Sequence, residues 1–407
     1  MIAMKAGFAT IILAVLLSGP APAQEKQKRG PVVLTEAARK LHQSVLVFDG
    51  HNDLPYACEH KGDRFFVRLD IAKPQPTLHT DIARLRKGNV GAQFWSAYVP
   101  AETAKTGTAV KDTLDQIDFI HRLVQKYPDT FELALTADDV VRIRKAGKIA
   151  SLIGVEGGHS IGNSLPVLRS LYRLGARYMT LTHTDTLDWA DSATDKPRHG
   201  GLTEFGEAVV HEMNRLGMLV DISHVSADTM RHVLKVSKAP IIASHSSAYA
   251  LAPHPRNVPD DVLKLVAKNG GVIMVNFYPG FITAEAARIG KESVHKYREL
   301  KTQYPKETDF KVAWKQWKNE RPIPSGSIHD VVDHIEHIGK VAGFDHVGLG
   351  SDFDGIDLVP QQLEDVSAYP LITQELLNRG HSAETIRKVL GENTLRVLRA
   401  EEAARAL

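Results

Sequence analysis

The sequence predicts a single α/β domain with a (β/α)8 barrel fold, and three observations support this fold class. Eight short apolar segments recur along the chain without the in/out alternation of a strand that has one solvent-facing side, as expected for parallel strands covered on both faces. A stretch with helical periodicity lies between most of them. Several of these stretches end in glycine, which is typical of helix C-termini. Eight such β-then-α units in series indicate this barrel.

The predicted elements follow one another in a regular order. The strands are expected at residues 45–48, 91–97, 149–155, 177–181, 218–222, 240–243, 271–275 and 346–349. The helices are expected at residues 35–43, 111–126, 136–146, 165–174, 203–216, 226–236, 260–269 and 329–342. Thr35, Thr203 and Ser226 are suited to cap their helices. A doubly wound open sheet is the alternative, but no Gly-x-Gly-x-x-Gly follows the first strand.

Two insertions interrupt this order. Residues 59–89 separate the first two strands and are expected to be partly extended, because Pro and Thr interrupt any helix there. Residues 277–345 separate strands seven and eight, and their middle is charged and aromatic. This longer insertion is compatible with a lid, an oligomer contact or a surface helical excursion. We expect it to shape the pocket that selects substrate side chains.

Composition and charge narrow the class of protein. The chain has 407 residues, 43% of them hydrophobic and 24% charged, and a formal net charge of +2. These values are ordinary for a globular protein and give no support to nucleic-acid binding or to a polybasic membrane surface. The single cysteine, Cys58, rules out an intrachain disulfide. We assign it no functional role.

The N-terminus predicts a secretory signal peptide at residues 1–23. Lys5 supplies a positive charge, residues 8–17 form an apolar core, and Ala21-Pro22-Ala23 offers a cleavage site. Cleavage there leaves residues 24–407 as one exported domain, periplasmic or secreted. A retained N-terminal anchor is the alternative, although the apolar run is short for a bilayer span.

Polar residues stand at the predicted C-terminal ends of most strands, where a barrel of this kind gathers its chemistry. The residues with metal-binding or acid–base side chains at these ends are His51, Asp53, Glu156, His183, His224, His245 and Asp352. Each alone would be a structural residue more often than not. Together on one face of a barrel they predict a metal site.

The number of potential ligands suggests two ions rather than one. His51, Asp53, Glu156, His224 and His245 are too many for one tetrahedral zinc with an open position. If Glu156 bridges, each ion has two further ligands of its own. Two ions about 3.5–4 Å apart would lower the pKa of a bridging water and polarise a carbonyl. Mixed imidazole and carboxylate ligands suit Zn²⁺ best, and Mn²⁺, Fe²⁺ and Co²⁺ are also compatible.

Other residues are weaker candidates for metal ligands or for a catalytic nucleophile. His329, His334 and His337 lie on one predicted helix, and we interpret them as a solvated helix face rather than a metal cluster. His159 and His254 lie beside the predicted site loops. No Gly-x-Ser-x-Gly elbow is found at residues 154–158 to supply a serine nucleophile.

Several motifs have a known counterpart. They are Phe48-Asp-Gly-His-Asn-Asp-Leu-Pro55, Gly154-Val-Glu-Gly-Gly-His-Ser160, Leu181-Thr-His183, Trp189-Ala-Asp-Ser192, Asp221-Ile-Ser-His-Val-Ser226, Ala243-Ser-His-Ser-Ser-Ala-Tyr249, Arg256-Asn-Val-Pro-Asp-Asp261, Met274-Val-Asn-Phe-Tyr278, Gly350-Ser-Asp-Phe-Asp-Gly355 and Gly391-Glu-Asn-Thr-Leu-Arg-Val397. In these motifs, in this order, the chain resembles the membrane (renal-type) dipeptidases, a branch of the metal-dependent amidohydrolase superfamily.

The resemblance implies roles for individual residues. His51, Asp53 and Glu156 would hold one zinc ion, and Glu156, His224 and His245 the other. His183 would contact the scissile carbonyl and stabilise the oxyanion, and Asp352 would carry a proton from the bridging water to the leaving amine. Arg256 would bind the substrate's terminal carboxylate, with help from Tyr278.

The resemblance also implies an activity and partners. We expect a binuclear zinc dipeptidase that cleaves dipeptides, including some with a C-terminal D-residue, by attack of a metal-bridging hydroxide. A homodimer is the family expectation, while the cysteines and apolar C-terminal tail of the anchored mammalian members are absent from the sequence. Hydrolysis of a lactone or an N-acyl amino acid by the same site is one alternative. A non-catalytic periplasmic binding protein on the same barrel is another.

Overall fold

The computed structural model describes residues 29–61, 63 and 68–405, so the predicted signal peptide at residues 1–23 lies outside the described residues. Contacts group the chain from Val32 onwards into one compact unit, and the fold presented below is that of its described residues. Among the described residues, none of the helices combines the length and hydrophobicity needed to span a bilayer.

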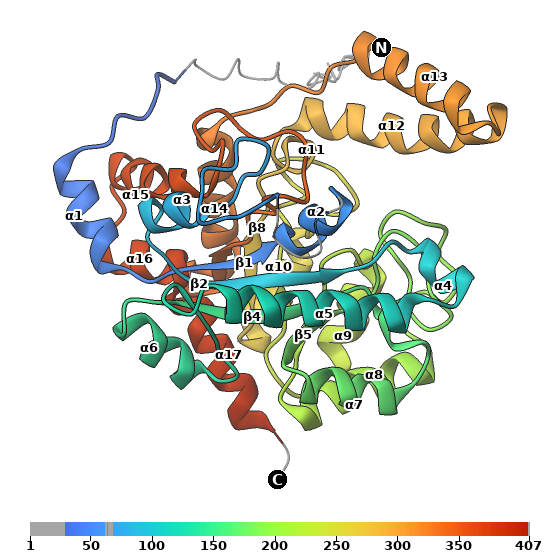
Figure 1. The fold of residues 1–407 in the computed structure, drawn as a ribbon, viewed down its shortest axis with the longest axis horizontal. Coiled ribbons are helices and arrows are strands. Elements are labelled where there is room, and N and C mark those ends of the chain that lie inside the picture. Colours follow the sequence, from blue (N-terminus) through green and yellow to red (C-terminus); the bar gives the residue numbers. More distant parts are fainter. Residues whose placement is uncertain (1–28, 62, 64–67, 406–407) are drawn as a thin grey trace, which may run out of the picture. The chain divides into compact units, whose positions relative to one another are not determined.

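Eight parallel strands close into a barrel, which confirms the predicted fold class and makes the open-sheet alternative wrong. Their neighbours follow the order β2-β1-β9-β8-β7-β6-β5-β4, and β4 pairs back onto β2 from Ala150↔Ala92 to Glu156↔Tyr98. The barrel strands are β1 Val47–Asn52, β2 Val90–Tyr98, β4 Ile149–Glu156, β5 Ala176–Thr180, β6 Leu219–Asp221, β7 Ile242–Ala243, β8 Val272–Val275 and β9 Val347–Leu349. β1 and β2 run towards α2 and α4 in Figure 1, so the C-terminal strand ends lie on that side.

One further strand, β3 (Phe131–Leu133), was not predicted. It pairs with the first half of β4, where Phe131 faces Ile149, whereas β5 pairs with the second half. β3 therefore extends the sheet beside the barrel without being one of its closing strands. With three residues it is too short to show a periodicity of its own.

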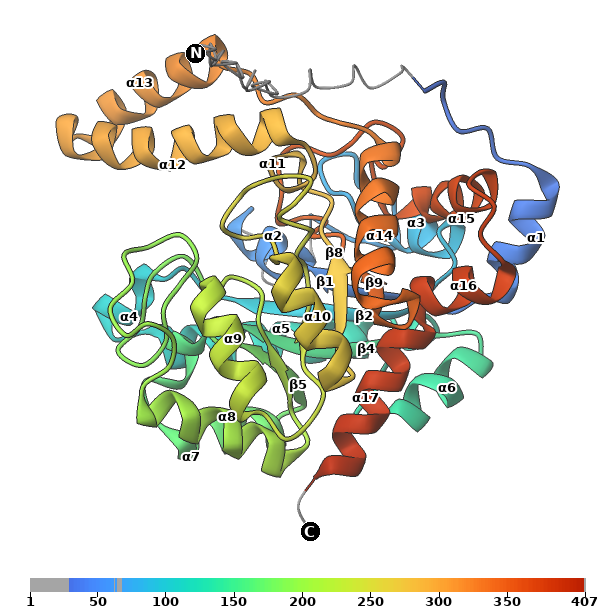
Figure 2. The same ribbon diagram turned by 180° about the vertical axis from the view of Figure 1, so that it is seen from behind.

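The predicted helices are present and surround the strands (Figures 1 and 2). They are α1 Glu36–Ser44, α5 Ala109–Lys126, α6 Ala137–Lys145, α7 Leu165–Arg173, α8 Glu204–Leu216, α9 Ala227–Val236, α10 Asp260–Asn269 and α14 Ile328–Ala342. Thr35, Thr203 and Ser226 cap α1, α8 and α9, each accepting a hydrogen bond from a backbone N–H in the first turn. The chain ends with α15 Tyr369–Asn378, α16 Ala383–Arg387 and α17 Asn393–Ala404.

The first insertion contains helices that the sequence did not reveal. α2 (Leu54–His60) runs into it, and α3 (Ile82–Lys87) lies near its end. Asp81 caps α3 by accepting from the Arg84 backbone N–H, and Leu85 is buried. The expectation that residues 59–89 hold no helix is therefore wrong, because a capped single turn needs only one buried side chain to dock it.

The second insertion is helical. It contains α11 (Pro279–Ile282), α12 (Ala284–Gln303) and α13 (Glu307–Glu320), and it leads into α14. α12 and α13 form a hairpin beyond α11 in both views (Figures 1 and 2). The Tyr297 ring on α12 packs edge-on against Phe310 and Trp314 on α13, with centroids 5.0 and 5.3 Å apart.

The barrel interior packs aromatic side chains against glycine. Phe94 stacks on Phe48 with centroids 5.6 Å apart and lies 4.7 Å from the Tyr178 ring. A Cβ at Gly154 would lie 2.0–2.4 Å from that Tyr178 ring, so only glycine leaves room for it. This packing fixes Tyr178 below the C-terminal ends of the strands.

A carboxyl on α17 is buried with a single long hydrogen bond among the described residues. Glu401 is fully buried, its Oε2 has no hydrogen-bond partner in the described part of the chain, and Asn214 Nδ2 lies 3.5 Å from Oε1. Burial raises the pKa of Glu401 to about 8. Since this pKa is higher in the folded than in the unfolded state, the protonated carboxyl stabilises the fold below the unfolded pKa. That stability is lost as the pH rises towards 8.

We expect Glu401→Gln to stabilise the protein at pH 8 much more than at pH 5, because the amide carries no charge to bury. The gain at pH 8 should be on the order of 3 kcal/mol in the free energy of unfolding. Thermal unfolding of both proteins at both pH values measures it. Glu285→Gln on exposed α12 is the control and should give no pH-dependent difference. An equal effect of Glu401→Gln at the two pH values would contradict the buried-acid explanation.

Candidate metal centre and substrate pocket

Seven polar side chains from six strand ends meet at one end of the barrel. Glu156 is the last residue of β4, and His51 lies in β1. The others lie in loops after β1, β5, β6, β7 and β9, and they are Asp53, His183, His224, His245 and Asp352. His224 and Asp352 adopt left-handed backbone conformations, with φ of 67° and 65°. Such strained non-glycine residues concentrate at functional sites.

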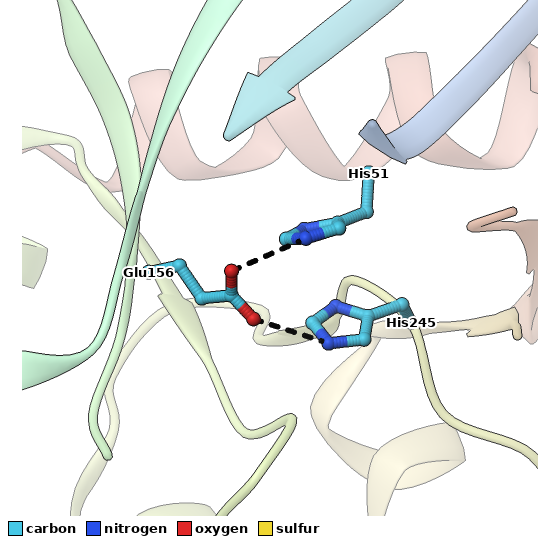
Figure 3. Close-up of side chains that lie close together, drawn as sticks. All are labelled: His51, Glu156 and His245. Atoms are coloured by element: carbon cyan, nitrogen blue, oxygen red, sulfur yellow. Dashed lines mark ion pairs between the residues drawn. The ribbon is translucent and has the colours of Figure 1, made fainter. Parts of the chain in front are cut away.

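The Glu156 carboxylate lies at the centre of this cluster. Its Oε2 is 3.4 Å from His51 Nε2, and its Oε1 is 3.5 Å from His245 Nε2 (Figure 3). His224 Nε2 also approaches Oε1, at 3.0 Å. The two oxygens of one carboxylate thus face different imidazoles.

The remaining members lie beside this core. Asp53 Oδ2 is 3.1 Å from His51 Nε2, and His183 Nε2 is 3.7 Å from Glu156 Oε1. The potential ligand atoms form three groups, each within 4.8 Å, and these groups are His51–Glu156–His245, Glu156–His183–His224 and His51–Asp53–Asp352. The structure therefore brings together all five residues predicted as ligands, with His183 and Asp352 next to them.

Hydrogen bonds from deeper in the barrel orient two of the imidazoles. Tyr178 Oη contacts His51 Nδ1 at 2.8 Å. Ser244 Oγ contacts His245 Nδ1 at 2.8 Å and donates to Asp221 Oδ2 at 2.6 Å. Each ring consequently presents Nε2 to the cluster, the arrangement that supporting residues impose on metal-ligating histidines.

The cluster fits a metal ion in its donor chemistry. Asp53 Oδ1 is buried and lacks a hydrogen-bond partner among the described residues. Buried donors and acceptors are rarely left unpaired. Burial and the nearby Arg256 charge lower the pKa values of His224 and His245, which favours the neutral imidazole that metal ligation needs.

Asp352 differs from the other carboxylates in its surroundings. Burial raises its pKa to about 8, and the neighbouring Asp53 and Glu156 carboxylates act in the same direction. Asn276 Nδ2 donates to Oδ2 at 2.9 Å and fixes the carboxyl group. Asp352 is thus held in place at the edge of the cluster, where it faces the cavity.

A cavity of about 550 Å³ opens over the cluster. Arg256, Tyr278 and Phe281 line one part of it, and Tyr56, His60 and Tyr98 are among the other lining residues. Of the long insertion, only its first residues, Tyr278 and Phe281, are among the described lining residues. A role of the rest of the insertion in shaping this pocket stays a prediction, and α2 and β2 supply further aromatic lining.

Arg256 is a buried cation that faces this cavity. It is 2% exposed, and its guanidinium donates to Ser246 Oγ at 3.3 Å and to His245 O at 3.4 Å. Its charge lies 5.2 Å from the Phe281 ring centroid, and no carboxylate of the described residues lies within ion-pair distance. Burial lowers its pKa to about 10, so the guanidinium stays charged near neutral pH.

The histidines of α14 do not form a solvated face, contrary to the sequence interpretation. His334 is fully buried, accepts from Ala248 N at 2.9 Å and donates from Nε2 to Ile282 O at 3.1 Å. His329 pairs with Glu375 and His337 with Asp260, each at 2.8 Å. Helical periodicity shows which residues share a stripe but not which stripe packs against a neighbour.

The two histidines beside the site bind backbone groups. His159 Nε2 donates to Val99 O at 3.0 Å, and His254 Nδ1 accepts from Arg256 N at 3.2 Å. Sequence reasoning missed Tyr178 and Ser244, the residues that orient His51 and His245. The available signals were the place of Tyr178 on a barrel strand and that of Ser244 next to a predicted ligand.

A parallel barrel with buried histidines and carboxylates at its C-terminal strand ends defines a metal-dependent hydrolase. The chain matches the membrane dipeptidase family (Peptidase family M19) over residues 35–407 and belongs to it. It is 42% identical over 375 residues to dipeptidase verJ of Clonostachys rogersoniana, covering 90% of this chain and 86% of that protein. The chain is therefore a metallo-dipeptidase with clusters of potential metal ligands.

Solved structures share the fold. The probable dipeptidase PvdM from Pseudomonas aeruginosa superposes with a TM-score of 0.79 at 25% identity, covering 91% of this chain and 98% of that one. A metallopeptidase from Rhodobacter sphaeroides, liganded with a phosphinate mimic of the dipeptide L-Ala-D-Ala, has a TM-score of 0.72 at 24% identity. That likeness covers 88% of this chain and 99% of the other, and it shows the fold.

We expect His334→Ala to destabilise the protein without changing its metal content. The substitution leaves Ala248 N–H and Ile282 C=O unpaired in the interior, which should cost about 2–4 kcal/mol. Urea unfolding measures the loss, and elemental analysis measures the metal. His337→Ala, which removes a partly exposed pair with Asp260, should cost less than about 1 kcal/mol. Metal loss with unchanged stability would contradict the structural role.

Proposed function

We propose that the chain is a binuclear zinc dipeptidase in which Glu156 bridges the two ions. The observation that carries this proposal is the division of the Glu156 carboxylate, with Oε2 towards His51 and Oε1 towards His224 and His245. One oxygen for each side is what a bridging carboxylate requires. This geometry supports two ligand sets with a shared member.

The ligand sets follow from this division. His51, Asp53 and Glu156 would hold one ion, and Glu156, His224 and His245 the other. Three imidazoles with two carboxylates suit zinc. When bound, the ions supply an activated water and polarise the scissile carbonyl.

Arg256 would set the direction in which a dipeptide binds. A free terminal carboxylate matches a buried guanidinium without an ion-pair partner, and it would offset the cost of burying that charge. Tyr278 lines the same part of the cavity, and burial raises the pKa of its hydroxyl to about 12, so it remains a hydrogen-bond donor. Carboxylate binding at this end places the peptide bond towards the His–Glu cluster.

His183 and Asp352 would act on the peptide bond itself. The His183 ring stacks on His224 with centroids 4.2 Å apart and lines the cavity, where it can donate a hydrogen bond to the carbonyl oxygen as negative charge develops. Asp352, fixed by Asn276, would take a proton from the attacking water and pass it to the leaving amine.

The remaining parts of the proposal rest on the sequence and the family resemblance. Residues 1–23 would direct export to the periplasm or outside the cell, and residues 24–407 would form the mature domain, as a homodimer. The family resemblance extends the substrates to dipeptides with a C-terminal D-residue. A panel of L-L and L-D dipeptides tests that extension.

Metal analysis tests the two-ion site directly. We expect two zinc ions per chain, loss of dipeptide hydrolysis on treatment with a chelator, and recovery when Zn²⁺ is added back. Glu156→Gln should remove both ions, because the amide is a poor bridging ligand, whereas Glu285→Gln should retain both. One ion per chain in fully active protein would refute the binuclear proposal.

Arg256→Met tests the carboxylate-binding role. We expect kcat/KM for dipeptides to fall about 30–150-fold, since a charge-assisted pair is worth about 2–3 kcal/mol, and KM to carry most of the loss. Dipeptide amides, which lack the carboxylate, should be poor substrates of both proteins and should lose little further activity. Arg177→Met, at a buried arginine that binds backbone carbonyls, is the matched control. Unchanged dipeptide turnover would exclude the role.

A further inference from the structure

A second cavity, of about 650 Å³, adjoins the catalytic one and has no lining residue in common with it. Three segments form its walls. They are residues 193–197 in the loop after β5, Tyr249 to Pro255 in the loop after β7, and the face of α12 that carries Lys291, Val294 and Arg298. Its volume is in the range that small organic ligands occupy.

Much of the wall of this cavity is apolar. Val294, Pro197 and Pro255 contribute aliphatic surface. The Tyr249 ring also lines the cavity, and it remains 40% exposed although it is a large side chain. An aromatic or aliphatic group in this cavity would cover surface that now contacts water, which favours binding of an apolar body.

The charged groups around the cavity favour an anion. Lys196 and Lys291 line it, and neither has a carboxylate within ion-pair distance in the part of the chain that the structure describes. Asp195, the carboxylate among the lining residues, lies 3.8 Å from Arg298, whose guanidinium also donates to Thr194 O at 3.0 Å. The acid is therefore already paired, and the two lysines leave a net positive charge for a ligand.

The wall between the two cavities is made of residues next to the catalytic groups. His254 lines the second cavity, and its ring packs on Phe281 of the first, with centroids 4.8 Å apart. Its Nδ1 accepts from Arg256 N. On the other wall, Ala193 N donates to His224 O at 2.8 Å. The two cavities are thus adjacent but separate.

We propose that this second cavity is a binding site for an organic carboxylate with an apolar body and no free amine, such as an N-acylated amino acid. The apolar walls would take the hydrocarbon part, and Lys196 and Lys291 would bind the carboxylate. A free ammonium group would face the same two lysines, so dipeptides and amino acids are disfavoured as ligands. The cavity therefore selects against the substrates of the neighbouring site.

Isothermal titration calorimetry of the zinc-loaded full chain with N-acetyl-L-phenylalanine tests this site. Arg256→Met serves as the background, because it removes the carboxylate-binding cation of the catalytic cavity. We expect the probe to bind to this protein, and to bind at least tenfold more weakly when Lys196→Met and Lys291→Met are added. The uncharged N-acetyl-L-phenylalaninamide should also bind at least tenfold more weakly than the acid.

Three results would contradict the proposed carboxylate site. They are the absence of binding in the Arg256→Met background, equal binding with and without the two lysines, and equal binding of acid and amide. The lysine substitutions are also made in the otherwise unchanged chain, where dipeptide turnover without the probe should equal that of the parent. Dipeptide turnover reports on the proposed function alone, so failure of either proposal is recognised separately.

Discussion

The placement of one buried carboxylate between several imidazoles is the constraint on which the rest of the structure depends. Glu156 is 4% exposed and approaches nitrogen atoms of His51, His224 and His245. Burying so many polar groups is costly unless each has a partner or a ligand. The barrel carries these groups on separate strand ends, and hydrogen bonds on the far side of two imidazoles offset part of the cost. Tyr178 contacts His51 Nδ1, and Ser244, which donates to Asp221, contacts His245 Nδ1.

The packing of the barrel interior and the geometry of the site therefore depend on the same residues. Tyr178 reaches His51 because Gly154 leaves room for its ring. Gly50 lets β1 approach the backbone at Ser244, since a Cβ at position 50 would lie 2.6 Å from Ser244 O. A side chain at either glycine would displace a residue that orients a proposed ligand. The geometry of the His–Glu cluster thus requires these two glycines as much as the fold does.

The sequence predicted the strands and the clustered residues because both depend on local signals, namely apolar runs and the polar residues that follow them. It missed β3, which is too short for a periodicity, and α3, which depends on the Asp81 cap. It also misjudged His334, whose partners Ala248 and Ile282 come from other elements. Contacts such as Tyr178 with His51, 127 positions apart, are set by barrel closure and leave no local pattern.

The loop after β7 joins the His–Glu cluster to the part of the cavity that Arg256 lines. It carries His245 at its start and Arg256 near its end, and a bridge between Ala248 and Val258 holds the two parts together. Asn257 Oδ1 accepts from Ser247 N at 3.1 Å, and His334 on α14 accepts from Ala248 N. The distance between a proposed metal ligand and the proposed carboxylate-binding cation is therefore fixed by the loop's own hydrogen bonds and by one buried histidine. Because the last peptide bond of a substrate lies one residue from its terminal carboxylate, this rigidity favours cleavage of the bond next to a free C-terminus, which in a dipeptide is the single peptide bond.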